Sequence, residues 1–187
     1  RDFIKTGAAA AAVSSLSIER GAFAQASDTV KVALIGCGGR GSGAANQALS
    51  TNGDVKLVAM ADAFKDRMDG SQKGLQRAHG LKVDVKDENK FVGFDAYKEA
   101  IALADMVILA TPPGFRPVHF AEAVKQGKHV FMEKPVAVDG QGVRQVLAAA
   151  QEAKKKNLKV GVGLQRHHQL VYRILERRLN NRTLSRF

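Results

Sequence analysis

The sequence is poor in cysteine and has no long apolar run. Cys37 is the only cysteine among 187 residues, which excludes an internal disulfide and a metal site built on several cysteines. No run of about eighteen or more apolar residues occurs, so the sequence predicts no transmembrane helix and no stable membrane insertion. With 45% hydrophobic and 25% charged residues, the composition is typical of a globular protein.

Acidic residues are scarce near the end of the chain. The net charge is +11, and ten of the 29 Lys and Arg residues lie between residues 154 and 187, where there is one acid. A basic terminal helix can bind nucleic acid, but no nucleic-acid-binding motif accompanies the charge. We therefore expect no nucleic-acid partner, and we expect acids in a continuation of the chain to balance this segment.

Residues 1–26 have the pattern of an export signal. A charged start and an alanine-rich apolar stretch are followed by Ala22-Phe23-Ala24, a small-x-small site for a signal peptidase. The start resembles a twin-arginine motif, with Arg1 as its second arginine, Phe3 in the aromatic place and Lys5 in the basic one. This predicts an exported, periplasmic protein that folds around its cofactor first; the alternative is a helix that packs on the domain.

After residue 28, short apolar segments alternate with amphipathic ones. The predicted strands are residues 29–35, 55–61, 106–110, 129–132 and 158–164. The predicted helices are residues 42–49, 64–79, 94–102, 118–126 and 142–156, with a loop over 80–90. The alternation predicts an α/β fold, a doubly wound parallel sheet over residues 29–164. Such sheets bind ligands at the carboxyl ends of their strands.

A glycine-rich loop follows the first predicted strand. Gly36, Gly38 and Gly41 form G-x-G-x-x-G, with Gly39 and Arg40 between them. The first glycine permits a tight turn, the second lets the backbone approach a pyrophosphate, and the third lets the helix pack closely. The free N–H groups of the helix N-terminus suit phosphate. The loop predicts a dinucleotide site of the Rossmann type; the alternative is a merely flexible loop.

Asp62 ends the second predicted strand, 21 residues after Gly41. A carboxylate at this place accepts hydrogen bonds from the adenosine ribose and repels a 2′-phosphate. The predicted cofactor is therefore NAD or NADP, with NAD favoured by Asp62. Lys65 and Arg67 lie just beyond and could accommodate NADP. The alternative role for Asp62 is an N-cap of the next helix.

Thr111, Pro112 and Pro113 end a buried strand. Because proline cannot extend a strand ladder, the chain must turn outward here and line the cofactor between its pyrophosphate and its nicotinamide. The alternative is a purely structural end to the strand. His119, in the next helix, is also a candidate cofactor residue, although packing is the safer interpretation.

Glu133, Lys134 and Pro135 place two charges at the end of a buried strand, which is costly unless the charges are used or solvated. Pro135 restricts Lys134 to extended backbone, so its side chain has a defined direction. A lysine beside the nicotinamide could stabilise an alkoxide or pass a proton, which makes Lys134 the candidate catalytic residue. The alternative is a surface ion pair.

These motifs, followed by Gly-Leu-Gln-Arg at residues 163–166, resemble the Gfo/Idh/MocA family of glucose-fructose oxidoreductase and inositol dehydrogenase over about residues 30–170. The resemblance implies tight NAD(P) binding and hydride transfer at a CH–OH carbon of a sugar or polyol. By position, Lys134 matches the catalytic lysine and Glu133 an acid that contacts the cofactor ribose. Gln165 and Arg166 match a segment near the cofactor. The bond between Lys134 and Pro135 is commonly cis in relatives.

Family members also carry a second α/β domain with an open, mostly antiparallel sheet. Residues 165–187, with a helix over 171–179, are expected to be the truncated start of that domain. This predicts a cofactor-binding fragment of a protein that is a homo-oligomer when full length. Two alternatives stay open: an NAD-dependent glycosidase that works by transient oxidation and elimination, and a non-catalytic nucleotide-binding module. We expect no metal, since His167 and His168 would point to opposite sides of a strand.

Overall fold

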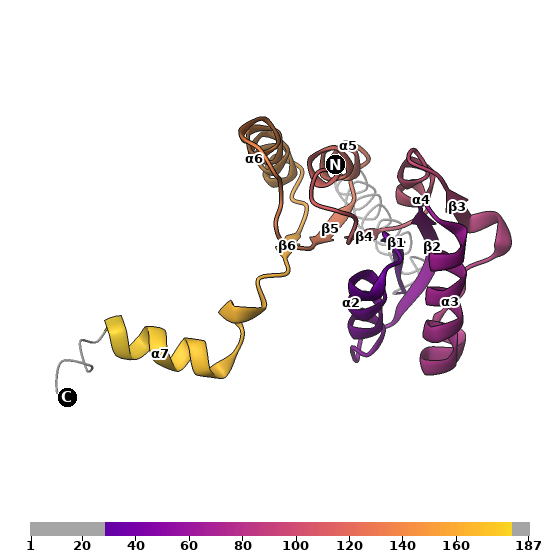
Figure 1. The fold of residues 1–187 in the computed structure, drawn as a ribbon, viewed down its shortest axis with the longest axis horizontal. Helices are drawn as coiled ribbons and strands as arrows, with labels where there is room; N and C mark the ends of the chain where they lie inside the picture. The colour runs from indigo at the N-terminus through magenta and orange to yellow at the C-terminus, as the bar shows by residue number, and fades with distance from the viewer. Residues whose placement is uncertain (1–28, 181–187) are drawn as a thin grey trace, which may run out of the picture.

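The computed structural model describes residues 29–180, which form one parallel sheet with helices on both faces (Figure 1). The predicted export signal at residues 1–26 lies outside this part of the chain and remains a prediction. Between residues 29 and 180, no helix combines the length and the apolar character needed to cross a membrane.

The sheet has six strands in the order β3-β2-β1-β4-β5-β6, and every neighbouring pair is parallel. The strands are β1 (Val30–Ile35), β2 (Val55–Asp62), β3 (Lys90–Val92), β4 (Met106–Leu109), β5 (His129–Met132) and β6 (Val160–Val162). This confirms the predicted doubly wound Rossmann fold. The direction of winding changes between β1 and β4, which is where such sheets bind their ligands.

The helices divide between the two faces of the sheet (Figure 1). One face carries α2 (Gly39–Leu49) and α3 (Lys65–His79). The other carries α4 (Tyr97–Ala102), α5 (Arg116–Lys125) and α6 (Gly140–Lys155). Successive side chains of β1 serve the two faces in turn, since Val32 and Leu34 pack under α2 whereas Ala33 and Ile35 belong to the core under α4 and α5. Every strand therefore packs against an apolar core on one or both faces of the sheet.

The elements differ from the sequence expectation in one missed strand and in several boundaries. The segment predicted as a loop over residues 80–90 contains two 3-10 turns, η1 (Gly80–Lys82) and η2 (Asp87–Asn89), and leads into β3. Three residues are too few to show the alternation of apolar and polar side chains that marks a strand. β3 is a strand because it pairs in parallel with the end of β2. The helix expected from residue 42 begins at Gly39, inside the glycine loop.

Beyond β6 the chain forms a 3-10 turn, η3 (Gln165–His167), and the helix α7 (Leu170–Asn180). The strand geometry assumed for His167 and His168 was wrong, because the turn begins at Gln165; both histidines are exposed. No residue of α7 is buried, and the helix lies apart from the layers of the sheet (Figure 1). The predicted division into residues 29–164 and 165–187 remains a prediction.

Candidate functional site

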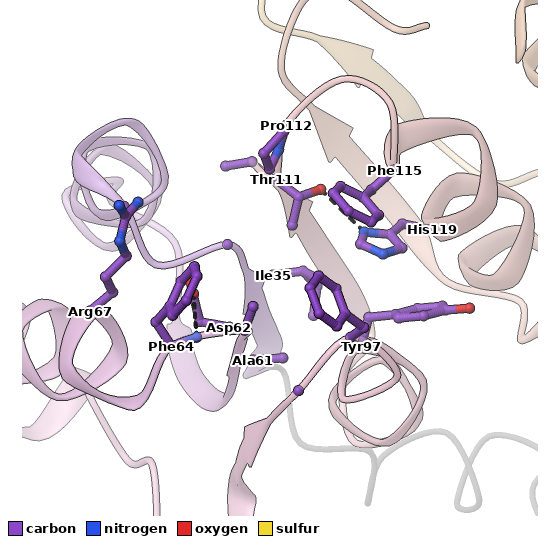
Figure 2. A pocket seen from close by; sticks show the side chains of 16 residues that line it. Ile35, Ala61, Asp62, Phe64, Arg67, Tyr97, Thr111, Pro112, Phe115 and His119 are labelled. Atoms are coloured by element: carbon purple, nitrogen blue, oxygen red, sulfur yellow. Dashed lines mark hydrogen bonds between the residues drawn. The ribbon is translucent and has the colours of Figure 1, made fainter.

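A pocket of about 400 Å³ opens at the carboxyl ends of β1, β2 and β4. Asp62 and Phe64 stand on one side of it, and the loop after β4 stands on the other (Figure 2). The structure brings together six of the predicted site residues as its lining: Gly36, Gly38, Asp62, Thr111, Pro112 and His119. Sequence motifs that lie 75 residues apart, from Gly36 to Thr111, therefore share one wall.

The glycines of the loop are needed for different reasons. Gly36 has a φ of +93°, and a Cβ there would lie 2.6 Å from the backbone nitrogen of Thr111. A Cβ on Gly41 would lie 1.9 Å from the carbonyl oxygen of Gly36, so only glycine lets α2 start this close to β1. Around Gly39, by contrast, nothing lies within 4 Å of a Cβ position. The backbone there is open to a bulky group, and no side chain caps the N-terminus of α2.

Asp62 fastens the end of β2 to the glycine loop. Its Oδ2 accepts a hydrogen bond of 2.6 Å from the backbone N–H of Cys37, and its Oδ1 accepts one of 2.9 Å from Phe64. The N-cap residue of α3 is Phe64, so Asp62 does not cap that helix. Each carboxylate oxygen has more than one acceptor site, so both can still accept a hydroxyl.

Cys37 lies inside the loop with only 3% of its surface exposed. Burial, reinforced by the negative charge of Asp62, raises the pKa of the Cys37 thiol well above its ordinary value. The thiol therefore stays protonated at neutral pH. Its role is to fill space under the loop, and it is not a nucleophile.

Aromatic side chains that the sequence analysis missed complete the pocket. The lining includes Phe64, Phe94, Tyr97 and Phe115, and the rings of Phe94 and Phe115 stack at 5.9 Å between centroids. Phe64 and Phe94 are 58% and 72% exposed, which is unusual for phenylalanine and gives the pocket an apolar rim. Phe64 comes just after a predicted strand, which was the available signal for it, whereas Phe94 follows β3, which was not predicted.

Arg67 is the cation of this pocket. Its guanidinium lies 5.5 Å from the centroid of the Phe64 ring and is the group nearest to a Cβ position on Gly38, at 3.9 Å. Lys65 does not line the pocket and pairs with Asp69 at 2.6 Å instead. Of the two basic residues expected to accommodate NADP, the structure therefore places only Arg67 at the site.

His119 is 5% exposed and stacks on Tyr97, with 4.1 Å between ring centroids. Burial, followed by repulsion from Arg116, lowers the pKa of His119 from 6.5 to about 4. The ring is therefore neutral at neutral pH, and its Nδ1 lies 3.2 Å from the Thr111 hydroxyl. His119 lines the pocket and also packs, so both interpretations given for it from sequence describe part of its surroundings.

Glu133 follows β5 and is buried, with 5% of its surface exposed. Its Oε1 accepts a hydrogen bond of 2.5 Å from the guanidinium of Arg40, in the first turn of α2. A Cβ on Gly163 would lie 2.6 Å from the same carboxylate, so a glycine after β6 makes room for it. The ion pair of Glu133 is thus formed with Arg40 and connects the glycine loop to the end of β5.

Lys134 is exposed, and the bond between Lys134 and Pro135 is cis, as the family resemblance implies. Gln165 and Arg166 are also exposed in η3, where the Arg166 guanidinium lies 5.3 Å from the Tyr172 ring. None of these residues, and neither Pro113 nor Glu133, lines the pocket. Across residues 29–180, no three His, Cys, Asp or Glu side chains gather as a metal site.

Residues 30–164 match the model of an oxidoreductase family with an NAD-binding Rossmann fold. The chain belongs to the Gfo/Idh/MocA family. It is 33% identical over 128 residues to an inositol 2-dehydrogenase of Rhizobium meliloti (strain 1021), a match that covers 68% of this chain and 34% of that relative. It is 30% identical over 113 residues to a glycosyl hydrolase family 109 protein of Solibacter usitatus (strain Ellin6076), covering 58% of this chain and 25% of that relative.

The fold of this chain also appears in solved structures. The scyllo-inositol dehydrogenase of Lactobacillus casei, solved with NAD(H) and scyllo-inositol, superposes with a TM-score of 0.65 at 23% identity. The match covers 84% of this chain and 42% of that one. The chain thus spans well under half the length of these relatives, and at this identity the structural likeness concerns the fold alone.

The site of this Gfo/Idh/MocA domain fits a dinucleotide. A Cβ would clash at Gly36 and Gly41 but not at Gly39, so the loop is open where a pyrophosphate approaches the N-terminus of α2. Asp62 presents carboxylate oxygens beside that opening, and the apolar rim suits a flat base. A pocket of about 400 Å³ has room for the adenosine half of the cofactor.

Proposed function

We propose that this domain binds NAD with its adenosine half in the pocket of Figure 2. The observation that carries the proposal is the 2.6 Å hydrogen bond between Asp62 and the backbone of Cys37, which joins the acid to the glycine loop as one unit. A ribose beside that loop meets the carboxylate, which favours its hydroxyls and disfavours a 2′-phosphate. Arg67 on the rim works against this preference and moderates it.

The further proposal concerns the reaction. The complete protein oxidises or reduces a CH–OH carbon of a polyol or sugar, as the names of its inositol dehydrogenase relatives suggest. Bound NAD supplies the acceptor for a hydride. Lys134 follows β5, beyond the change of winding from the adenosine pocket. Its exposed side-chain nitrogen can donate a hydrogen bond to the substrate oxygen and stabilise the charge that develops there as the hydroxyl proton passes to a base. The ion pair between the buried Glu133 and the half-exposed Arg40 holds the residue next to this lysine.

Cofactor choice is tested by titrating the chain with NADH and NADPH and following heat or the fluorescence of the reduced nicotinamide. We expect NADH to bind at least about tenfold more tightly, a difference of about 1.4 kcal/mol. Asp62→Ala should weaken NADH binding and reduce the preference for NADH over NADPH. Asp66→Ala, an exposed acid in the first turn of α3, is the matched control. Equal affinity of the unaltered chain for both cofactors would contradict the role of Asp62.

The role of Lys134 is tested by turnover of inositols and free sugars in the complete protein. Lys134→Ala should lower kcat by roughly a hundredfold or more, while leaving the Kd for ADP, which fills the adenosine half alone, nearly unchanged. Lys154→Ala, on the exposed side of α6, should match the unaltered protein in both measurements. An unchanged kcat for Lys134→Ala would remove this residue from the reaction.

A second candidate activity is glycoside cleavage, favoured by the 30% identity to a glycosyl hydrolase family 109 protein. In that reaction a sugar carbon is oxidised transiently, the aglycone is eliminated, and the carbon is reduced again. A chromogenic glycoside separates the two activities. Cleavage without net formation of NADH supports the glycosidase, whereas net NADH formation from a free polyol supports the dehydrogenase.

A further inference from the structure

The second charged group buried near the site is Arg116, at the first position of α5, with 1% of its surface exposed. Its Nη2 donates to the carbonyl oxygen of Thr111, and its Nη1 donates to the carbonyl oxygen of Glu133. Its Nε has no hydrogen-bond partner within the described part of the chain. One guanidinium therefore joins the two loops that follow β4 and β5.

Arg116 is not explained as a partner of an acid. The carboxylate of Glu133 is occupied by Arg40, and Arg116 contacts the backbone of Glu133 instead. A buried guanidinium is costly, and here burial lowers the pKa of Arg116 while the charge of Glu133 raises it. Such a group is expected only where its geometry is needed.

Arg116 replaces hydrogen bonds between the strands that the sheet itself cannot make here. The ladder between the strands of this region ends with the N–H groups of Ala110 and Glu133, which donate to β1 and β4. Beyond those bonds, Pro112 and Pro135 have no N–H, so neither loop can continue the ladder. The fork of Arg116 bonds the carbonyls at the point where strand pairing stops.

Thr111 is held a second time from the same helix. His119 lies one turn after Arg116 in α5, and its ring contacts the Thr111 hydroxyl. The backbone and the side chain of Thr111 are thus both fixed by α5. The wall of the adenosine pocket is set by the same helix that sets the backbone before Lys134.

We propose that Arg116 is a positioning residue that aligns the adenosine pocket with Lys134, so that one dinucleotide engages both at once. The inference rests on the proposed function, because it needs NAD to lie across the ends of β1, β4 and β5. The side-chain hydrogen bonds of Arg116 go to backbone oxygens, and Arg116 is not assigned contact with the cofactor. Its loss should leave two half-sites that no longer match one ligand.

The measurement is the ratio of two dissociation constants, for ADP and for NADH, by calorimetric titration of the chain. ADP fills the adenosine half alone, whereas NADH spans both halves. Partial unfolding weakens both ligands by the same factor, so the ratio reports alignment and not stability. The variants are Arg116→Met and Arg116→Lys, with Arg77→Met on the exposed side of α3 as control.

We expect NADH to bind the unaltered chain more tightly than ADP. Arg116→Met should lower this advantage by about tenfold, the usual effect of losing hydrogen bonds to a charged group. Arg116→Lys should lower it too, because an ammonium keeps the charge but lacks the planar fork. The control should leave it unchanged. If Arg116→Met does not fold, Arg116→Lys carries the test alone.

Three results would overturn the inference: an advantage of NADH that is absent in the unaltered chain, one that survives in Arg116→Met, or one fully restored by Arg116→Lys. Loss of NADH and ADP binding by an equal factor in Arg116→Met is the second of these results, because it leaves the ratio unchanged and shows a structural role only. A folded, unaltered chain that binds no NADH at all overturns the proposed function, and the inference with it.

Discussion

Helices cover the two halves of the sheet, around β1 and β2 and around β5 and β6, to different degrees. Around β1 and β2, helices lie on both faces, and most residues of these strands are buried. Around β5 and β6, helices α5 and α6 cover one face, every residue of β6 is at least partly exposed, and α7 has no buried residue. The first half holds the glycine loop and Asp62, whereas the second half holds Lys134, Gln165 and Arg166 (Figure 1).

Under the proposed function, this difference separates the residues that bind the cofactor from the residue that takes part in the reaction. Asp62 and the glycine loop are fixed by hydrogen bonds between backbone and side chain within a closed layer. Lys134 is exposed, and its position depends on two cross-links to its neighbour Glu133, from Arg40 and from Arg116. We therefore expect cofactor binding to be robust within this domain and the placement of Lys134 to be sensitive to few side chains.

The largest effect tests how much the core on the α5 face of the sheet, which continues under β1 and β2, adds to stability. Phe120 in α5 is fully buried in the apolar core on this face of the sheet. Phe120→Ala should lower the free energy of unfolding by about 3 to 5 kcal/mol, measured by urea denaturation. Val118→Ala on the same helix, where the side chain is 48% exposed, should change it by less than about 0.5 kcal/mol. A small effect of Phe120→Ala would mean that the open half contributes little to stability.

The next effect concerns the tightest contact of the first half. Gly41→Ala would place a Cβ 1.9 Å from the Gly36 carbonyl oxygen, so α2 must move away from β1. We expect a loss of roughly 3 kcal/mol in stability and weaker NADH binding. Gly39→Ala, with nothing within 4 Å of its Cβ position, should keep the stability of the unaltered chain. Equal melting temperatures for the two variants would contradict this packing.

His119 lies where the two halves meet and makes stability depend on pH. Its pKa is about 4 in the folded chain, against an ordinary value of 6.5. Between these values the unfolded chain binds a proton that the folded chain does not, so stability is complete above about pH 6.5 and falls below it. Between about pH 7 and 5 the loss should reach about 2 kcal/mol.

His119→Gln should remove that part of the pH dependence, because an amide can contact Thr111 without titrating in this range. Denaturation of both proteins at about pH 7 and about pH 5 gives the comparison. Identical slopes of stability against pH for the two proteins would show that His119 is protonated in the folded chain at about pH 5. The surroundings of its ring, between Tyr97 and Thr111, would then be open to water.

The sequence predicted the fold well where the signals are local. Gly36 to Gly41 and Asp62 stand directly after strands with clear apolar runs, so their meeting at one edge of the sheet followed from the parallel topology. The strand β3 was missed because three residues carry no periodicity, and its pairing with β2 is a tertiary effect. Because β3 was missed, the place of Phe94 on the rim of the pocket was missed as well.

The ion-pair and hydrogen-bond partners of the charged residues near the site could not be predicted from the sequence. Glu133 and Lys134 are adjacent in sequence, yet the buried acid pairs with Arg40, which lies 93 residues away. Arg116 carried no signal, since an arginine at the start of a helix is ordinarily solvated; only the fold shows that it is buried between two loop carbonyls. Sequence spacing predicts which residues reach the strand ends, but the cross-links among them depend on side-chain burial.

The smallest expected effect concerns α7, the most open element of the second half. Leu175 is 45% exposed and touches no core, so Leu175→Ala should change the free energy of unfolding by less than about 0.5 kcal/mol. Leu109→Ala, from a fully buried position in β4, gives the scale, with an expected loss of about 2 to 5 kcal/mol. A loss above about 1 kcal/mol for Leu175→Ala would show that the apolar side of α7 is covered in solution, and the contrast between the two halves would then be smaller than the structure indicates.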